Sequence, residues 1–157
     1  MRDLNELNIN EGGRPVFRRV PTDEEIGAFE SHFNLRLPPD YVSFLKQTNG
    51  GHPEIDSFRP SGAEEDTLWS VNRFYHLSPE KDDLEGLWRA KGEWQGVLGD
   101  RVVPIANDSG GNQILLDYSS GSPTVGLCIH DDDFRMLHLS DTFSSFLDML
   151  VRDPEIR

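Results

Sequence analysis

Ser109, in the turn Asp108-Ser109-Gly110-Gly111, is a residue that could act as a catalytic nucleophile. Trypsin-like proteases present their reactive serine in a turn of this kind. Their mechanism also needs a histidine base and an orienting acid, held in place by a fold of two barrels. A chain of 157 residues is too short for two barrels, and His32, His52 and His76 have no protease-like sequence around them. We therefore expect this turn to be structural.

The segment His130-Asp131-Asp132-Asp133, with His138 nearby, offers oxygen and nitrogen ligands for a divalent ion. Hard cations do prefer clusters of carboxylates. Adjacent Asp side chains in a hairpin, however, point in different directions. The segment also lacks a glycine at the position that a calcium-binding loop requires. We expect a solvated turn and no metal site.

Two further acidic clusters could form either a solvated face or a surface for a cationic partner. One is Glu64-Glu65-Asp66, in a predicted loop, and the other occupies residues 80–85, at the predicted first turn of a helix. Tryptophan is common at the energetic centre of interfaces, and Trp94 is the best candidate for exposure, whereas Trp69 and Trp88 are expected in the core. The predicted partner-binding residues are Glu64, Glu65, Asp66, Asp82, Asp83, Trp94, Asp131, Asp132 and Asp133.

The whole chain carries a net charge of −13, from 28 acidic and 15 basic residues. A field of this sign repels phosphate backbones and attracts cationic partners, so we expect no nucleic acid partner. The simpler interpretation, that the acidic balance only keeps the protein soluble, stays open. The sequence contains no glycine-rich phosphate loop, nucleotide fingerprint or zinc-ligand spacing. We therefore expect neither a catalytic residue nor a cofactor.

Length and cysteine usage indicate a single domain in a reducing compartment. Cys128 is the one cysteine, which excludes an intramolecular disulfide and a Cys-based zinc site. The N-terminus lacks the apolar run of a signal peptide. No segment approaches the ~18 uninterrupted apolar residues that indicate a membrane span. The sequence predicts a soluble, cytoplasmic protein with no membrane partner.

Two helices are predicted near the N-terminus. Thr22 and Glu25 form a capping box, in which each side chain accepts a hydrogen bond from the backbone of the other. Apolar residues follow on one face at helical spacing: Ile26, Phe29 and Phe33. The prolines at 38 and 39 break this helix, and a second one begins near Pro39. Asn49-Gly50-Gly51 is expected to end the second helix, whose buried face comprises Tyr41, Phe44 and Leu45.

The remainder alternates between strand-like and helical patterns. Residues 55–76 are strand-like, and the spacing of Leu84, Leu87 and Trp88 predicts a helix within 80–94. A meander of four strands is predicted at 102–105, 113–118, 124–130 and 135–139, and a last helix begins at Ser140 or Asp141 and stops at Pro154.

The predicted class is α+β, as a single domain. Its N-terminal helix pair packs against a mostly antiparallel mixed sheet, with a further inserted helix and a C-terminal helix. Residues 1–20 are expected to form a loose N-terminal arm, and 21–153 the domain itself.

Four stretches occur in an order that is typical of one family. They are Leu37-Pro38-Pro39-Asp40-Tyr41 with Asn49-Gly50-Gly51; Val103-Pro104-Ile105-Ala106-Asn107-Asp108 with Gly111-Asn112; Leu115-Leu116-Asp117 with His130-Asp131; and Leu139-Ser140-Asp141-Thr142-Phe143. Together these stretches resemble the SUKH superfamily over roughly residues 20–150. The superfamily includes bacterial immunity proteins for secreted toxins and a fungal regulator of cell-wall synthesis.

The resemblance implies a non-catalytic protein-binding domain. The first interpretation is an immunity protein that neutralises a cognate, basic toxin domain, for example a nuclease. The alternative is a regulatory or scaffold module for endogenous protein partners. A monomer or a weak homodimer is expected.

Overall fold

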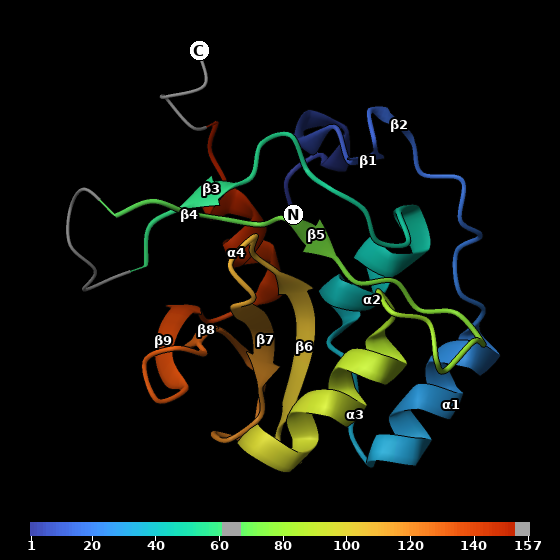
Figure 1. Cartoon of the computed structure of the whole chain (residues 1–157). Coiled ribbons are helices and arrows are strands. Elements are labelled where there is room, and N and C mark those ends of the chain that lie inside the picture. Colours follow the sequence, from blue (N-terminus) through green and yellow to red (C-terminus); the bar gives the residue numbers. More distant parts are fainter. Residues whose placement is uncertain (61–66, 153–157) are drawn as a thin grey trace.

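The order of helices and strands confirms the predicted α+β class (Figure 1). The computed structural model describes residues 1–60 and 67–152. The first part contains η1 (Leu4–Leu7), β1 (Asn10–Glu11), β2 (Arg14–Pro15), α1 (Asp23–Phe33), α2 (Pro39–Gln47), β3 (Ser57–Phe58), β4 (Trp69–Ser70), β5 (Arg73–Phe74) and α3 (Leu87–Leu98). The second part contains β6 (Val102–Asn107), β7 (Gln113–Asp117), β8 (Thr124–Ile129), β9 (Arg135–Ser140) and α4 (Phe143–Met149).

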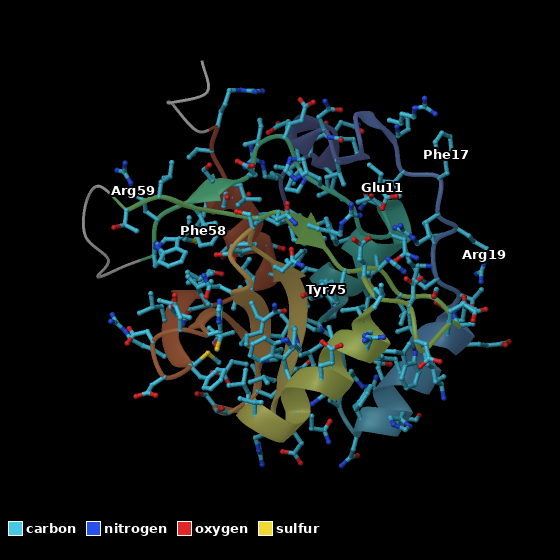
Figure 2. All side chains as sticks on the ribbon, in the orientation of Figure 1. Glu11, Phe17, Arg19, Phe58, Arg59 and Tyr75 are labelled. Carbon is cyan, nitrogen blue, oxygen red and sulfur yellow. The ribbon has the colours of Figure 1, made fainter. Side chains whose placement is uncertain are left out.

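Residues 1–20 pack against the rest of the chain, so the prediction of a loose arm is wrong. Leu7, in η1, is completely buried in the main core. Asn10 exchanges two backbone hydrogen bonds with His52, at 2.8 and 2.7 Å. Phe17, by contrast, is 84% exposed and points away from the molecule (Figure 2).

An ion-pair network fastens this N-terminal segment to β5. Glu11 Oε1 lies 2.6 Å from Arg18 and 2.9 Å from Arg73, and Arg73 also lies 3.3 Å from Glu85. Arg18 donates a further hydrogen bond of 2.6 Å to the carbonyl of Asn49. Burial acts to raise the pKa of Glu11, but the hydrogen bonds and charges of the two arginines outweigh it and lower the pKa. The network therefore holds a charged carboxylate.

The opening helices begin where the sequence predicts. The amide of Glu25 donates to Thr22 Oγ1 at 3.1 Å, and the amide of Thr22 donates to Glu25 Oε1 at 2.9 Å, which completes the capping box. α2 begins at Pro39 and buries Tyr41, Phe44 and Leu45. It ends at Gln47, with Thr48 as an extended C-cap, so the glycines that follow do not terminate it.

Gly50 and Gly51 instead let the chain approach its neighbours closely. Their φ angles are +84° and +116°, a region that favours glycine. A Cβ atom at Gly51 would lie 2.8 Å from side-chain carbons of Ile9 and Val16. Gly51 also exchanges backbone hydrogen bonds with Phe74 in β5, at 3.1 and 2.8 Å. The glycines thus join α2 to the sheet.

The inserted helix starts later than predicted, at Leu87. Leu84 precedes it and is exposed, and the carboxylates of residues 80–85 lie in the preceding loop and not in its first turn. The reason is a backbone pairing: His76 donates to the carbonyl of Glu85 at 3.1 Å and accepts from the amide of Leu87 at 2.8 Å. This pairing holds residues 85–87 against His76, two residues beyond β5, and delays the helix.

The central sheet has the order β5-β6-β7-β8-β9 and confirms the predicted meander, with strand bounds within two residues. In the described part of the chain every pair of named strands is antiparallel, and a parallel contact is limited to the bridge between His76 and Gly86. β9 forms the left edge of the sheet in Figure 1.

The two faces of the sheet pack into different clusters. One face contributes Val103, Leu116 and Leu127 to the main core, together with buried residues of α1, α2 and α4. The opposite face forms a second cluster that is covered by α3: Val102, Leu115 and Cys128 under Trp94 and Leu98. Trp69 and Trp88 are partly buried against the main core, and Trp94 is partly buried against the second cluster, so burial does not separate Trp94 from the other two as predicted.

The closing helix begins at Phe143, after the N-cap Thr142, and therefore later than predicted. The amide of Ser145 donates to Thr142 Oγ1 at 3.0 Å. Asp40, in the first turn of α2, accepts hydrogen bonds from the amide and hydroxyl of Ser144, which joins the two helices. The helix ends at Met149, and Pro154 lies outside the described residues.

Candidate functional site

The turn that could have held a nucleophile is organised around its aspartate. Asp108 Oδ1 accepts from the amides of Gly110 and Asn112 at 2.9 and 2.8 Å, and Oδ2 accepts from the Asn112 side chain at 2.8 Å. Asn112 Oδ1 accepts from the amide of His130 at 3.0 Å. His130 Nε2 lies 2.7 Å from the carbonyl oxygen of Gly110, while Ser109 is exposed. These polar groups fix the backbone, as the structural interpretation predicts.

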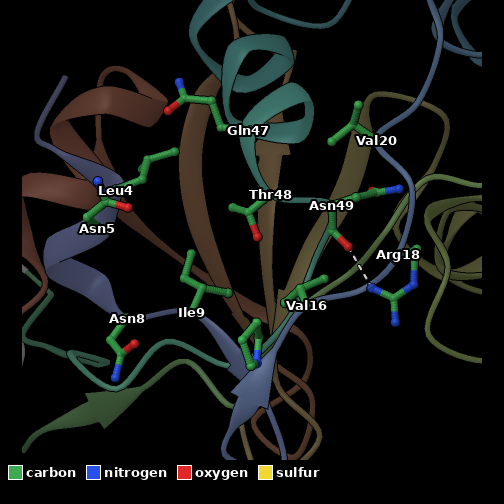
Figure 3. A pocket seen from close by; sticks show the side chains of 11 residues that line it. Leu4, Asn5, Asn8, Ile9, Val16, Arg18, Val20, Gln47, Thr48 and Asn49 are labelled. Atoms are coloured by element: carbon green, nitrogen blue, oxygen red, sulfur yellow. Dashed lines mark hydrogen bonds between the residues drawn. The ribbon is translucent and has the colours of Figure 1, made fainter.

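A cavity of about 290 Å³ opens between the N-terminal segment and the C-terminal end of α2 (Figure 3). Arg18 lines it, and its guanidinium is bonded to the carbonyl of Asn49 and to Glu11. Among the described residues that line the cavity, none supplies a carboxylate, an imidazole or a thiol. The cavity therefore lacks the groups that general acid–base chemistry requires.

The β8–β9 hairpin presents the carboxylates of residues 131–133 to solvent. Asp133 and Phe134 both have positive φ angles, +53° and +54°, so the chain turns sharply there. Asp132 Oδ2 lies 3.4 Å from Arg135, an exposed ion pair. Across residues 1–60 and 67–152, no group of three His, Cys, Asp or Glu side chains is placed to hold a metal ion.

Apolar side chains gather beside these carboxylates, where Trp94 of α3 reaches the turn of the β8–β9 hairpin. Trp94 is half-buried: one side covers the second cluster, and its ring meets Phe134 edge to face, with centroids 6.1 Å apart. Val97 lies one turn further along α3 than Trp94. Met136 is the cross-strand partner of Cys128, which belongs to the cluster that Trp94 covers. Val97, Phe134 and Met136 are 53%, 42% and 38% exposed. We call these four residues and the 131–133 carboxylates the α3–β9 surface.

The other predicted binding residues lie elsewhere. Asp82 and Asp83 precede α3, at its opposite end. Asp83 Oδ2 lies 2.7 Å from His76 Nε2, and this hydrogen bond is the main cause that lowers the pKa of Asp83, against the effect of burial. Residues 64–66 lie outside the described part of the chain. Of the predicted set, the structure brings together Trp94 and the 131–133 carboxylates, through Phe134.

Three members of the surface were not predicted from sequence: Val97, Phe134 and Met136. Met136 alternates with Leu137 in a strand that has one exposed face, which is the signal that could have indicated it. Phe134 follows three aspartates in a turn, where an aromatic residue has no neighbour in sequence to pack against. Val97 carried no comparable signal, because its exposure depends on how α3 lies on the sheet.

The four α-helices and the five-stranded antiparallel sheet of the described residues define a small α+β domain. A model of the SMI1 / KNR4 family (SUKH-1) matches residues 20–149, and the chain belongs to this family. It is also similar to the SPbeta prophage-derived uncharacterized protein YokK of Bacillus subtilis (strain 168), with 26% identity over 170 residues that cover 96% of this chain and 84% of the relative. The resemblance seen in the sequence is thereby confirmed. No helix in the described part of the chain is long and apolar enough to cross a membrane.

Proposed function

We propose that the protein is an immunity protein, which binds a cognate secreted toxin and neutralises it without catalysis. The observation that carries this proposal is the α3–β9 surface, where exposed apolar side chains adjoin three exposed carboxylates. Specific protein interfaces combine buried aromatic anchors with a polar rim. Membership of the family and the prophage origin in the name of the Bacillus relative are compatible with this function.

The partner is a basic protein domain. The net charge of −13 steers cationic partners toward the chain, and the 131–133 carboxylates add a local negative field next to the apolar anchors. Arg135 offsets part of the charge of Asp132, which leaves two carboxylates of the turn for the partner. If the toxin is a nuclease, these carboxylates would occupy its basic cleft in place of phosphate groups.

The direct test is co-expression with the product of the neighbouring upstream gene. We expect this chain to restore growth of cells that produce that protein and to co-purify with it. Binding should weaken as salt rises from low to physiological ionic strength, because screening acts on exposed charges. An affinity that stays flat across salt would remove the electrostatic part of the proposal.

A matched pair of variants tests the surface itself. Changing the 131–133 carboxylates to Asn should weaken binding at least tenfold. The control, E24Q/E54Q/D148N, changes three exposed carboxylates that lie outside the surface, so that net charge shifts equally. We expect the control to alter affinity less than threefold. Equal losses in both variants would show that net charge, and not this surface, selects the partner.

The regulatory alternative predicts a different outcome. A chain that fails to protect against its neighbour's product, yet binds an endogenous protein of its own cell, would be a regulatory or scaffold module. The same co-expression and purification experiments separate the two functions.

A further inference from the structure

The two edges of the central sheet differ in how their backbone groups are used. β5, at one edge, is two residues long, and Phe74 exchanges backbone hydrogen bonds with Gly51. β9, at the other edge, is six residues long and, among the described residues, pairs with β8 alone (Figure 1). An edge strand with free backbone groups is a template for a further strand.

The register shows which backbone N–H and C=O groups of β9 point away from β8. The carbonyl of Asn107 accepts a hydrogen bond from the amide of Asn72, so the backbone groups of Asn107 point toward β5. The backbone groups of Gln113, its partner in β7, must then point toward β8. Gln113 pairs with Cys128, so the backbone groups of Cys128 point toward β7. The backbone groups of Met136, which lies opposite Cys128 in β9, therefore point outward, away from β8. Backbone groups alternate along a strand, so those of His138 also face outward.

The neighbouring hydrogen bonds agree with this assignment. The amide of His130, two residues beyond Cys128, donates toward β7, to Asn112 Oδ1. Pro104 has no N–H to donate and pairs with Leu115. By the same alternation the backbone groups of Leu115 point toward β8, so this pair requires no hydrogen bond from Pro104.

β9 carries little of the protection that edge strands commonly have. Prolines, lysines and bulges usually prevent unwanted pairing. The stretch Arg135-Met136-Leu137-His138 contains no proline or lysine, and its register with β8 is regular. The register shift comes after it, between the partners of Gly126 and Val125. The positive charge of Arg135 is engaged by Asp132.

The charges at the two ends of β9 select what can pair with it. The 131–133 carboxylates precede the strand, and Asp141 follows it. An antiparallel pairing of two copies would bring the 131–133 turn of one copy toward Asp141 of the other, so like charges would meet. An extended segment with Lys or Arg residues near its ends would meet carboxylates at both ends instead.

We infer that the partner adds an extended, basic strand to the outer edge of β9, with its backbone bonded to Met136 and His138. This inference rests on the proposed function and specifies how the toxin domain is held. Main-chain hydrogen bonds supply part of the affinity in such strand addition, and side chains on alternate positions supply specificity. An apolar side chain of the added strand would lie beside Met136 and Phe134.

The test measures amide hydrogen exchange of this chain alone and in complex with the purified, inactivated product of the neighbouring upstream gene. The amides of Met136 and His138 should exchange fast in the free protein and at least tenfold more slowly in the complex. The amide of Leu137 faces β8 and should be slow in both states, which makes it an internal control.

Met136→Pro and Met136→Leu form the matched variants. The proline removes the outward N–H and should weaken binding at least tenfold, whereas the leucine keeps both the N–H and an apolar side chain and should bind within threefold of wild type. If the complex forms and growth is protected, but Met136 and His138 exchange at the free rate, strand addition is wrong and the immunity function stands. If the neighbouring product does not bind at all, both proposals fail.

Discussion

Replacing Asp108 by alanine should remove the three hydrogen bonds that organise the β6–β7 turn. Asp108 and Asn112 are both buried, whereas Gly110 is exposed. A hydrogen bond to a charged group contributes about 1.5–3 kcal/mol, and an unsatisfied buried group adds to the loss. The amide of Gly110 can bond to water once the carboxylate is gone, so we count the two bonds to Asn112 at the lower value. The expected loss in the free energy of unfolding is about 3 kcal/mol.

Urea unfolding followed by tryptophan fluorescence measures this loss, with an unchanged m value as the condition for comparison. A loss of this size lowers Tm by about 6–12 °C in a chain of this length. Asp108→Asn keeps one acceptor oxygen for the two amides and should lose about half as much. Ser109→Ala, at the exposed neighbouring position, should stay within about 0.5 kcal/mol of wild type. A loss below about 1 kcal/mol for Asp108→Ala would refute the reasoning.

Three further predictions concern the glycine pair, the first helix and the cysteine. Gly51→Ala should cost about 1–3 kcal/mol in thermal unfolding, because φ is +116° and the new Cβ would lie 2.8 Å from two side chains of the N-terminal segment. Glu25 has its pKa lowered to about 2, chiefly by the hydrogen bond from Arg19. This stabilisation is complete above the unfolded pKa of ~4.3 and is lost as pH falls toward 2. The stability difference between wild type and Glu25→Gln, less than ~1 kcal/mol for a surface pair, should therefore vanish over that range in urea unfolding. Burial raises the pKa of the Cys128 thiol, so a disulfide reagent should modify it only after unfolding, and rapid modification of the folded protein would contradict this.

Patterns among neighbouring residues were enough to predict most of the fold. The capping box of Thr22 and Glu25 is a contact across three residues, and it forms as expected. The four strands between 102 and 140 are separated by short turns, so their pairing order follows from the chain itself. Such elements need little information from distant parts of the sequence.

Two of the wrong predictions, the loose N-terminal arm and the early start of the inserted helix, depend on contacts beyond the immediate sequence neighbours. Residues 1–20 look polar, yet Asn10 pairs with His52, and η1 places Leu7 in the main core. Helical spacing at Leu84 was overridden because backbone hydrogen bonds join Glu85 and Leu87 to His76 and leave Gly86 between them extended. Local propensity is a weak guide where tertiary pairing offers the backbone other partners.

Local environment, more than net charge, decides which acidic residues of this chain can meet a partner. Asp108, Glu11 and Asp83 are engaged in hydrogen bonds within the chain, so their carboxylates help to hold the fold. The 131–133 carboxylates are exposed beside Phe134 and Trp94, so they alone combine charge with an apolar anchor among the predicted residues that the structure describes. Charge next to an anchor contributes more to specificity than charge spread over the surface, because binding partly desolvates it. The same turn also begins β9, so a strand added to that edge would carry its basic residues directly to these carboxylates.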